Sequence, residues 1–347
     1  ESTGFVFTHE RMTLLLHISD VHLRCKKDAM FINALRSLRD ITQTIDRQRL
    51  IIVVTGDILD DTRKSIDPDT TRLLLDFFDL IEMAARQCIV IPGNHDLMSE
   101  SLCPFLSRRE FSGCSKWPGI VYYPHTGRFT VDGTGLMFHV VRASPTSKDM
   151  PQHLTFESVD PGDGHRHVAL YHGSPPPVLP KGYCLGLLGD EHEVKFFAGG
   201  DTQDVVGLGL AEAGVAQRWG EGAWAYAGSM TQRSLNEACY DHGALLWDLD
   251  AATVKFCPVF SGYAQMKITG LEGSNRVLLA HHRRETWIEW NVLEPLLHDA
   301  QLEVDIRDGV DQEAVLLQLR ERGVREVRVR NTTATPQIAT ADRHHTT

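Results

Sequence analysis

The stretch Leu14-Leu15-Leu16-His17-Ile18-Ser19-Asp20-Val21-His22 decides the fold. A short apolar run that stops at polar residues predicts a buried strand leading into a loop. Residues 50–54, Leu-Ile-Ile-Val-Val, repeat this pattern and stop at Thr55-Gly56-Asp57. Residues 88–91, Cys-Ile-Val-Ile, repeat it again and stop at Pro92-Gly93-Asn94-His95-Asp96. The sequence therefore predicts three strands that each end in side chains able to bind a metal ion.

Helical segments separate these strands. Residues 28–48 and 69–86 carry apolar residues at helical spacing. Strand, helix, strand, helix, strand is the pattern of a sheet with crossover helices, so we expect an α/β fold. Open α/β sheets bind ligands beyond the carboxyl ends of their strands, so the three polar motifs should meet at one edge.

Beyond residue 110 the sequence predicts a second sheet of shorter strands. The expected strands are 119–123, 128–131, 135–141, 167–172, 194–199, 223–227, 244–249 and 253–257. Residues 143–165 and 173–193 are rich in Pro, Gly, Ser and His, so we expect surface loops there.

Four parts of the chain follow from these patterns. We expect an N-terminal extension at residues 1–11 and a main domain at 12–261. A smaller α/β domain should occupy 262–331, ending in strand, helix and strand. The polar residues 332–347 predict a disordered tail.

Composition narrows the class of protein. The formal net charge of the 347 residues is -11, which excludes a strongly basic protein that coats nucleic acid. It does not exclude a nuclease, because bound cations supply positive charge at a phosphate. The seven cysteines form no CxxC pair, which indicates reduced thiols and a cytoplasmic protein, or a nuclear one in a eukaryote. No apolar run is long enough to span a membrane.

The polar motifs indicate metal chemistry. Carboxylate, imidazole and amide oxygen atoms suit divalent ions such as Mn²⁺. A carboxylate shared by two ions, here Asp57, fixes a metal pair that clamps a phosphoryl group. His95 suits a general acid that Asp96 would orient. The candidate metal ligands from the strand ends are Asp20, His22, Asp57, Asn94 and His172.

Taken singly, these motifs carry little information, since Asp-x-His is usually a surface loop and Gly-Asp is often only a turn. Taken in order, they resemble the calcineurin-like metallophosphoesterase superfamily over residues 13–260. That pattern is DxH, GD, GNH[DE], a later His-Gly and a closing GHxH. The resemblance implies a four-layer αββα sandwich and two metal ions, Mn²⁺ or alternatively Mg²⁺. Asp20, His22 and Asp57 would hold the first ion, Asp57, Asn94 and His172 the second, and His95 would be catalytic.

The closing motif departs from the family pattern. Gly200-Asp201-Thr202-Gln203 stands where GHxH is expected, so Asp201 and Gln203 become candidate ligands. Asp201 can replace the first histidine, whereas Gln203 is a weaker, neutral ligand for the first ion. A competing alignment uses Gly189-Asp190-Glu191-His192, which supplies a histidine. We rank it second because the strand before Gly200 is the more regular of the two.

Residues 226–242 are similar to a block of the SbcD-like DNA repair nucleases, the meiotic recombination eleven family. This block contains Tyr226-Ala227-Gly228-Ser229, Arg233, Asn236-Glu237 and Asp241-His242-Gly243. The resemblance implies Mn²⁺-dependent 3′-to-5′ exonuclease and single-strand endonuclease activity in DNA double-strand-break repair or recombination. It also implies a capping domain after residue 262, a homodimer and an SbcC-like coiled-coil ATPase partner. The bland alternative is that Tyr-x-Gly-Ser only makes a tight turn.

Two other functions stay open. The first is a metallophosphoesterase acting on small nucleotides or phosphate esters. The second is a DNA-binding scaffold whose catalysis is weak because Asp201 and Gln203 replace histidines.

Overall fold

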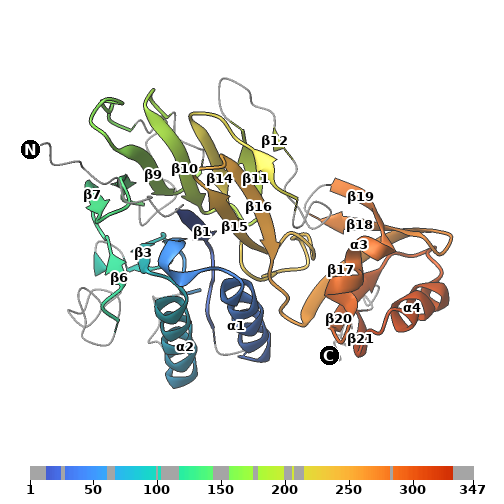
Figure 1. Ribbon diagram of the computed structural model, residues 1–347. Helices are drawn as coiled ribbons and strands as arrows, with labels where there is room; N and C mark the ends of the chain where they lie inside the picture. The colour runs from blue at the N-terminus through green and yellow to red at the C-terminus, as the bar shows by residue number, and fades with distance from the viewer. Residues whose placement is uncertain are drawn as a thin grey trace, which may run out of the picture. The chain divides into compact units, whose positions relative to one another are not determined.

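The structure of the chain is a computed structural model (Figure 1). It describes residues 13–24, 28–60, 67–98, 101–102, 117–143, 156–174, 179–198, 205–206, 215–281 and 284–330. The predicted extension at 1–11 and the predicted tail at 332–347 therefore lie outside the described residues. The chain divides into two compact units, Glu1–Tyr263 and Ala264–Thr347.

The first sheet of unit 1 is built around the three predicted strands. β1 (Leu14–Ile18), β2 (Leu50–Thr55) and β3 (Gln87–Ile91) pair in parallel. These strands are nearly continuous apolar runs because both faces of the sheet are covered. The sheet is completed by β6 (Ile120–Tyr122), β15 (Gly243–Asp248), β16 (Thr253–Pro258) and β13 (Gln217–Arg218), in the order β13-β16-β15-β1-β2-β3-β6.

Two helices cover one face of this sheet. α1 (Asp28–Gln43) connects β1 to the short 3-10 helix η2 (Arg47–Arg49), and α2 (Pro68–Ala84) connects β2 to β3. α2 begins where the Asp67 carboxylate accepts a hydrogen bond from the Thr70 backbone, with Pro68 in its first turn. Its apolar side packs into the same buried cluster as the strands. Figure 1 shows α1 and α2 side by side.

The second sheet packs on the other face of the first. Its strand order is β12-β11-β14-β10-β9-β8-β7. The strands are β7 (Gly127–Val131), β8 (Leu136–Val141), β9 (Arg166–His172), β10 (Tyr183–Gly189), β11 (Lys195–Phe197), β12 (Val205–Val206) and β14 (Ala223–Tyr226). Leu15 and Val53 of the first sheet share one buried cluster with Leu170 and Leu187 of the second. A two-residue ribbon, β4 (Leu97–Met98) and β5 (Ser101–Leu102), follows β3.

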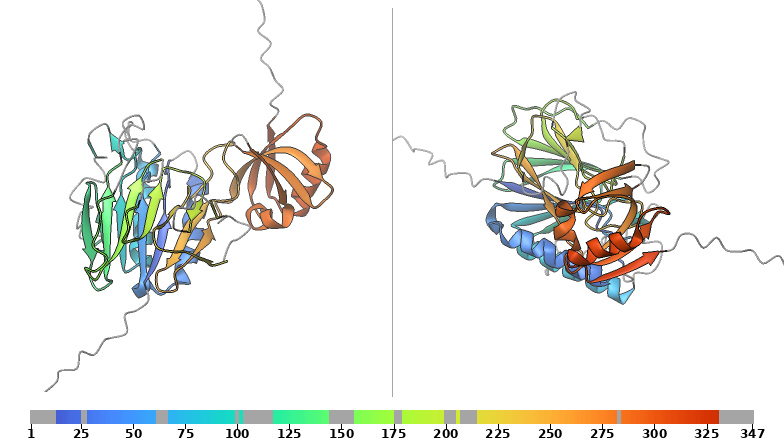
Figure 2. Two further views of the ribbon diagram at one scale, coloured as in Figure 1. Left: turned by 90° about the horizontal axis from the view of Figure 1, so that it is seen from above. Right: turned by 90° about the vertical axis from the view of Figure 1, so that its right-hand side faces the viewer.

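The α/β fold class is confirmed, with one difference in layering. The described residues of unit 1 form a helical layer and two seven-stranded sheets, which Figure 2 shows stacked in its right-hand view. Among these residues no helix covers the outer face of the second sheet. Tyr171 and Tyr183 point to that face, where Phe156 packs against them. Alternation along β9 explains this, since Leu170 faces the first sheet and Tyr171 faces away.

One expectation about loops was wrong. We expected residues 173–193 to form surface loops, but β10 lies near the centre of the second sheet. It pairs in parallel with both β9 and β14. Leu185, Leu187 and Leu188 are fully buried. The glycines in this segment and the prolines before it are typical of loops, so the sequence pattern did not predict a strand that is buried on both faces.

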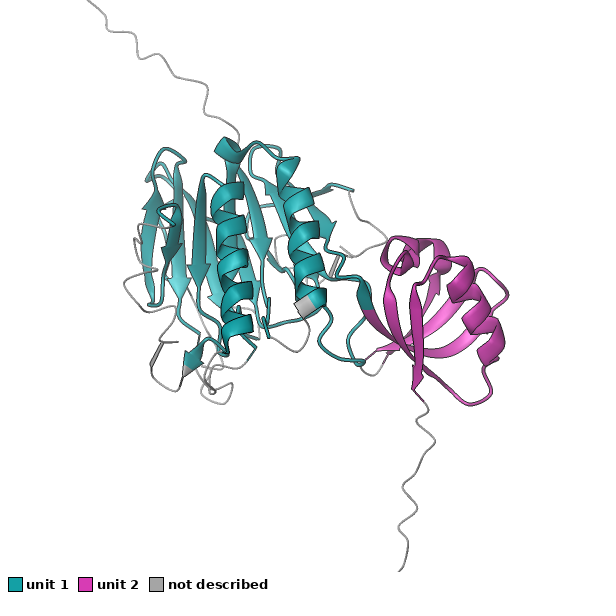
Figure 3. Ribbon diagram, turned by 90° about the horizontal axis from the view of Figure 1, so that it is seen from below, with its two compact units in different colours: residues 1–263 teal, residues 264–347 magenta. Residues whose placement is uncertain are grey.

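Unit 2 is a smaller α/β unit (Figure 3). Its sheet has the order β19-β18-β17-β20-β21, and Trp290, Val304 and Leu319 are buried in it. The expected strand, helix and strand near its end are present as β20, α4 and β21, with β20 and β21 parallel. The elements are β17 (Tyr263–Glu272), β18 (Arg276–His281), β19 (Arg284–Glu289), α3 (Trp290–Leu297), β20 (Gln301–Ile306), α4 (Gln312–Glu321) and β21 (Glu326–Arg330). Among the described helices of both units, none has the length and apolarity needed to cross a membrane.

Candidate metal centre

Five strand ends of unit 1 meet at one place. The loops after β1, β2 and β3 come from the first sheet, and the ends of β9 and β10 come from the second. The residues gathered there are Asp20, His22, Asp57, Asn94, His95, His172, Asp190 and His192. The expected convergence of the strand-end motifs is therefore found.

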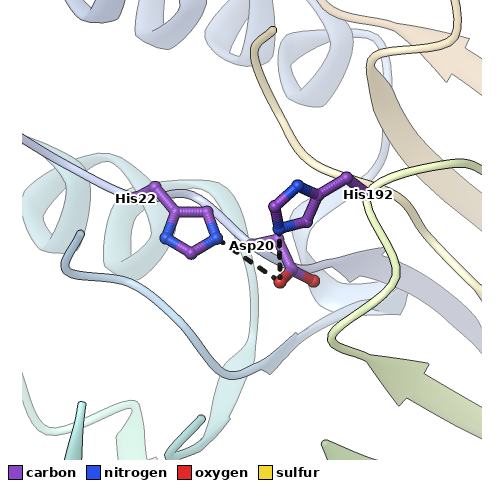
Figure 4. Close-up of side chains that lie close together, drawn as sticks. All are labelled: Asp20, His22 and His192. Atoms are coloured by element: carbon purple, nitrogen blue, oxygen red, sulfur yellow. Dashed lines mark ion pairs between the residues drawn. The ribbon is translucent and has the colours of Figure 1, made fainter. Parts of the chain in front are cut away.

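The first group of donors is Asp20, His22 and His192 (Figure 4). Nε2 of His22 lies 3.5 Å from Asp20 Oδ1, and Nε2 of His192 lies 3.7 Å from the same oxygen. Asp20 Oδ1 is buried and has no hydrogen-bond partner among the described residues. A buried carboxylate oxygen without a partner is costly, and a cation would satisfy it. These donors fit a divalent ion.

Asp57 joins this group to a second one. Its Oδ2 lies 3.7 Å from His22 Nε2, and its Oδ1 lies 3.4 Å from His172 Nε2. Asn94 Oδ1 lies 3.0 Å from the same His172 nitrogen. The two oxygens of one carboxylate thus face two donor groups, which is the arrangement expected of a ligand shared by two ions.

Asp190 and His192, the pair ranked second from the sequence for the closing motif, lie at the site. His192 belongs to the first donor group, and Asp190 Oδ1 lies 3.9 Å from His172 Nε2 in the second. Both lie in the loop after β10, the strand that sequence reasoning missed. Asp201 and Gln203, ranked first from the sequence, lie outside the described residues.

Asp96 does not have the orienting role that we expected. It is fully buried, and its carboxylate accepts hydrogen bonds from the backbone of Gly93, Ile58 and Leu59. Burial and the charge of Asp57 raise the pKa of Asp96 to about 6, although these hydrogen bonds oppose the shift. Asp96 therefore ties the loop after β2 to the loop after β3. The atom that Nδ1 of His95 contacts is instead the backbone carbonyl oxygen of Asp60.

Carboxylates dominate the charge of the site. Burial opposes a charged imidazole at His172, but Asp57, Asp20 and Asp190 outweigh it and raise the pKa of His172 to about 10. Burial lowers the pKa of His22 well below its usual value, and Arg233 and His192 add to that effect. The carboxylates thus attract positive charge to His172 Nε2, where a metal ion would replace the proton.

Backbone strain is concentrated at the same place. Six described non-glycine residues have positive φ, and four of them are Asp20, His22, Asp57 and Asp190. Such conformations cost energy and persist where the surrounding structure enforces them, often at functional sites. All four lie in the loops that follow β1, β2 and β10, where the strained backbone turns their side chains toward the other donors.

Two further residues of the site were not identified as functional from the sequence. Glu237 Oε1 lies 3.0 Å from His192 Nδ1, and Arg233 Nη1 lies 3.1 Å from His192 Nε2. Both belong to the block 226–242, which was noted only for its resemblance. Hydrogen bonding to Glu237 and the charge of Asp20 outweigh burial and raise the pKa of His192, while Arg233 opposes the shift.

The donor set fits a pair of divalent ions. Asp20, His22, Asp57 and His192 would hold the first, and Asp57, Asn94, His172 and Asp190 the second. When bound, such a pair neutralises phosphate charge and lowers the pKa of a water molecule.

The chain is similar to known proteins. The family model described as calcineurin-like phosphoesterase matches residues 13–206, more than half of the chain. A protein of Acanthamoeba polyphaga mimivirus, the uncharacterized protein R555, is 22% identical over 291 residues. The aligned part is 75% of this chain, and the chain spans only 19% of that relative's length.

Proposed function

The chain belongs to the calcineurin-like phosphoesterase family, and on that premise we propose that it is a Mn²⁺-dependent nuclease of DNA repair or recombination. The family assignment makes it a metal-dependent phosphoesterase, and DNA as substrate is the proposal. One observation carries it: the block 226–242, which resembles the SbcD-like nucleases, is built into the metal centre. Its Arg233 contacts both His22 and His192, and its Glu237 contacts His192.

His95 is the proposed general acid. Its Nε2 lies 3.9 Å from Asp57 Oδ2, and its side chain is 32% exposed, so a substrate can reach it. Because Nδ1 contacts the carbonyl oxygen of Asp60, that nitrogen carries a proton. The ring then gives or takes a proton at Nε2. We propose that Nε2 protonates the leaving oxygen of the cleaved phosphodiester.

The first experiment is a Mn²⁺ titration of cleavage on labelled duplex, single-stranded and hairpin DNA. A cyclic dinucleotide and an aryl phosphate monoester serve as small substrates in parallel. We expect Mn²⁺-dependent cleavage of DNA that His95→Ala abolishes while Mn²⁺ binding is retained. Hydrolysis of the small substrates without cleavage of DNA would favour the small-substrate function. No cleavage of any substrate in excess Mn²⁺ would favour the scaffold.

A second experiment decides which residue completes the first metal position. We propose His192, because it shares Asp20 Oδ1 with His22. His192→Gln should then raise the Mn²⁺ concentration needed for half-maximal activity, and Gln203→His should leave it unchanged. The reverse result would restore Asp201 and Gln203 as the closing ligands.

A homodimer and an SbcC-like coiled-coil ATPase partner are proposed from the resemblance alone. Light scattering of the purified protein tests the dimer. Co-purification with an SbcC-like ATPase from the same source tests the partner.

A further inference from the structure

We infer that Arg233 competes with the first metal ion for the Nε2 atoms of His22 and His192, an inference that rests on the proposed metal site. Arg233 Nη1 lies 3.2 Å from His22 Nε2 and 3.1 Å from His192 Nε2. Those two nitrogens, with Asp20 Oδ1, are the donors proposed for the first ion. The guanidinium group thus lies against the atoms that the ion would bind.

An imidazole nitrogen that contacts Arg233 cannot bind a metal ion at the same time. A guanidinium group has only N–H donors, so both imidazole nitrogens must accept in these contacts. An Nε2 atom that accepts from Arg233 uses the lone pair that a metal ion needs. The same nitrogen cannot serve both at once.

Arg233 has other contacts that would remain if Nη1 moved away from the two imidazoles. Its Nη2 donates to Asp60 Oδ1 at 2.7 Å, and its backbone N–H donates to Glu237 Oε2 at 2.8 Å. Its Nε is buried and has no hydrogen-bond partner among the described residues. Apart from the two imidazole contacts, the guanidinium group is therefore held only through Nη2. A turn about that anchor would release the imidazoles and keep the pair with Asp60.

The plainer interpretation is that Arg233 only pairs with Asp60. Asp60 already has such a partner, because Arg24 Nη1 donates to its Oδ2 at 3.2 Å. No contact of Arg24 with His22 or His192 occurs among the described residues. Arg24 shares the carboxylate but not the imidazoles, which makes it the matched control.

Two consequences follow for metal loading. Arg233 lowers the affinity of the first position below that of its ligands alone, because the ion must break two charge-assisted contacts. Among the described residues, the Arg233 guanidinium group contacts neither His172 nor Asn94, so the affinity of the second position should be unaffected. Replacing Arg233 should therefore change the affinity of the first position and leave that of the second unchanged.

The test is Mn²⁺ binding by calorimetry and electron paramagnetic resonance to the wild type, Arg233→Gln and Arg24→Gln. We expect Arg233→Gln to bind the first ion at least about tenfold more tightly, equivalent to ~1.4 kcal/mol. Arg24→Gln should bind both ions as the wild type does. An equal or weaker first affinity in Arg233→Gln overturns the inference, as does the same gain in Arg24→Gln.

Crystal structures of the wild type with and without Mn²⁺ give a readout that needs no variant. Arg233 Nη1 should contact both imidazoles without Mn²⁺ and lie beyond hydrogen-bond reach of both when two ions are bound. Unchanged contacts with both ions bound overturn the inference. Its failure differs from that of the proposed function: altered Mn²⁺ affinity without DNA cleavage counts against the nuclease, and DNA cleavage with unaltered affinity counts against the role of Arg233.

Discussion

Glu237 orients His192, with Oε1 of the carboxylate 3.0 Å from Nδ1 of the imidazole. A proton fixed on Nδ1 leaves the Nε2 lone pair for a metal ion. The other oxygen of Glu237 accepts the backbone N–H of Arg233. Burial opposes the charged carboxylate, but hydrogen bonds from His192 and Arg233 outweigh it and hold the pKa of Glu237 at about 2. Both oxygens are thus engaged, and both contacts need the ionised form.

Glu237→Gln should weaken Mn²⁺ binding at the first position by about 10- to 100-fold. Glutamine has one acceptor oxygen, so it cannot serve both the imidazole and the Arg233 backbone. Calorimetric titration with Mn²⁺ measures the change. Glu191→Gln is the matched control, because Glu191 pairs with Lys195 and Ser174. Equal Mn²⁺ affinities in the wild type and Glu237→Gln would show that Glu237 does not position His192.

Asp96→Ala should destabilise unit 1 by roughly 3 kcal/mol, because three buried backbone N–H groups lose a charged acceptor. Denaturant unfolding without metal measures this loss. Asp96→Asn should cost less, since it keeps the shape and one acceptor oxygen. If Asp96→Ala had the same unfolding free energy as the wild type, Asp96 would not hold the loops after β2 and β3 together.

Gly93→Ala should abolish Mn²⁺ binding, because a Cβ atom at this position would collide with Oδ1 of Asp57. That oxygen also accepts the backbone N–H of His95 at 2.8 Å, so it cannot move freely. Gly127→Ala is the control, since a Cβ atom there has no neighbour within 4 Å. Calorimetric titration with Mn²⁺ compares the two variants. A wild-type Mn²⁺ affinity in Gly93→Ala would show that the loop after β3 can move enough to avoid the collision.

The sequence predicted the parts of the site that depend on neighbouring residues. Asp20, Asp57 and Asn94 lie just beyond short apolar runs, which predict buried strands. The rule that ligands bind at the carboxyl ends of such strands then placed them together.

The sequence could not predict contacts that depend on distant packing. Gly186 leaves room for Leu179 and Trp224, so a position without a side chain lies in a well-packed strand, β10. Gly189 lies where a Cβ atom would meet Thr55 O and Ser19 Oγ, at the approach of the two sheets. Because β10 was not predicted, Asp201 and Gln203 were ranked above Asp190 and His192 from the sequence. Arg233 reaches His22 across 211 positions of sequence, and no local pattern announces such a contact.

We predict that unit 1 becomes less stable in acid because of two contacting histidines that are not among the proposed metal ligands. His139 Nε2 lies 2.9 Å from His167 Nδ1, and both residues are buried. Burial, with the charges of His167 and Arg128, lowers the pKa of His139 from 6.5 to about 4.

The sign of the effect on stability follows from this lowered pKa. The unfolded chain takes up the proton first as the pH falls, so the stabilisation is fully present above pH 6.5. It is lost between pH 6.5 and 4, by roughly 2 to 3 kcal/mol. His139→Gln keeps a hydrogen-bond donor toward His167 but cannot titrate, so its unfolding free energy should fall less over that range. Denaturant unfolding at several pH values, followed by tryptophan fluorescence, measures both proteins. Parallel pH profiles would show that His139 does not cause the acid sensitivity.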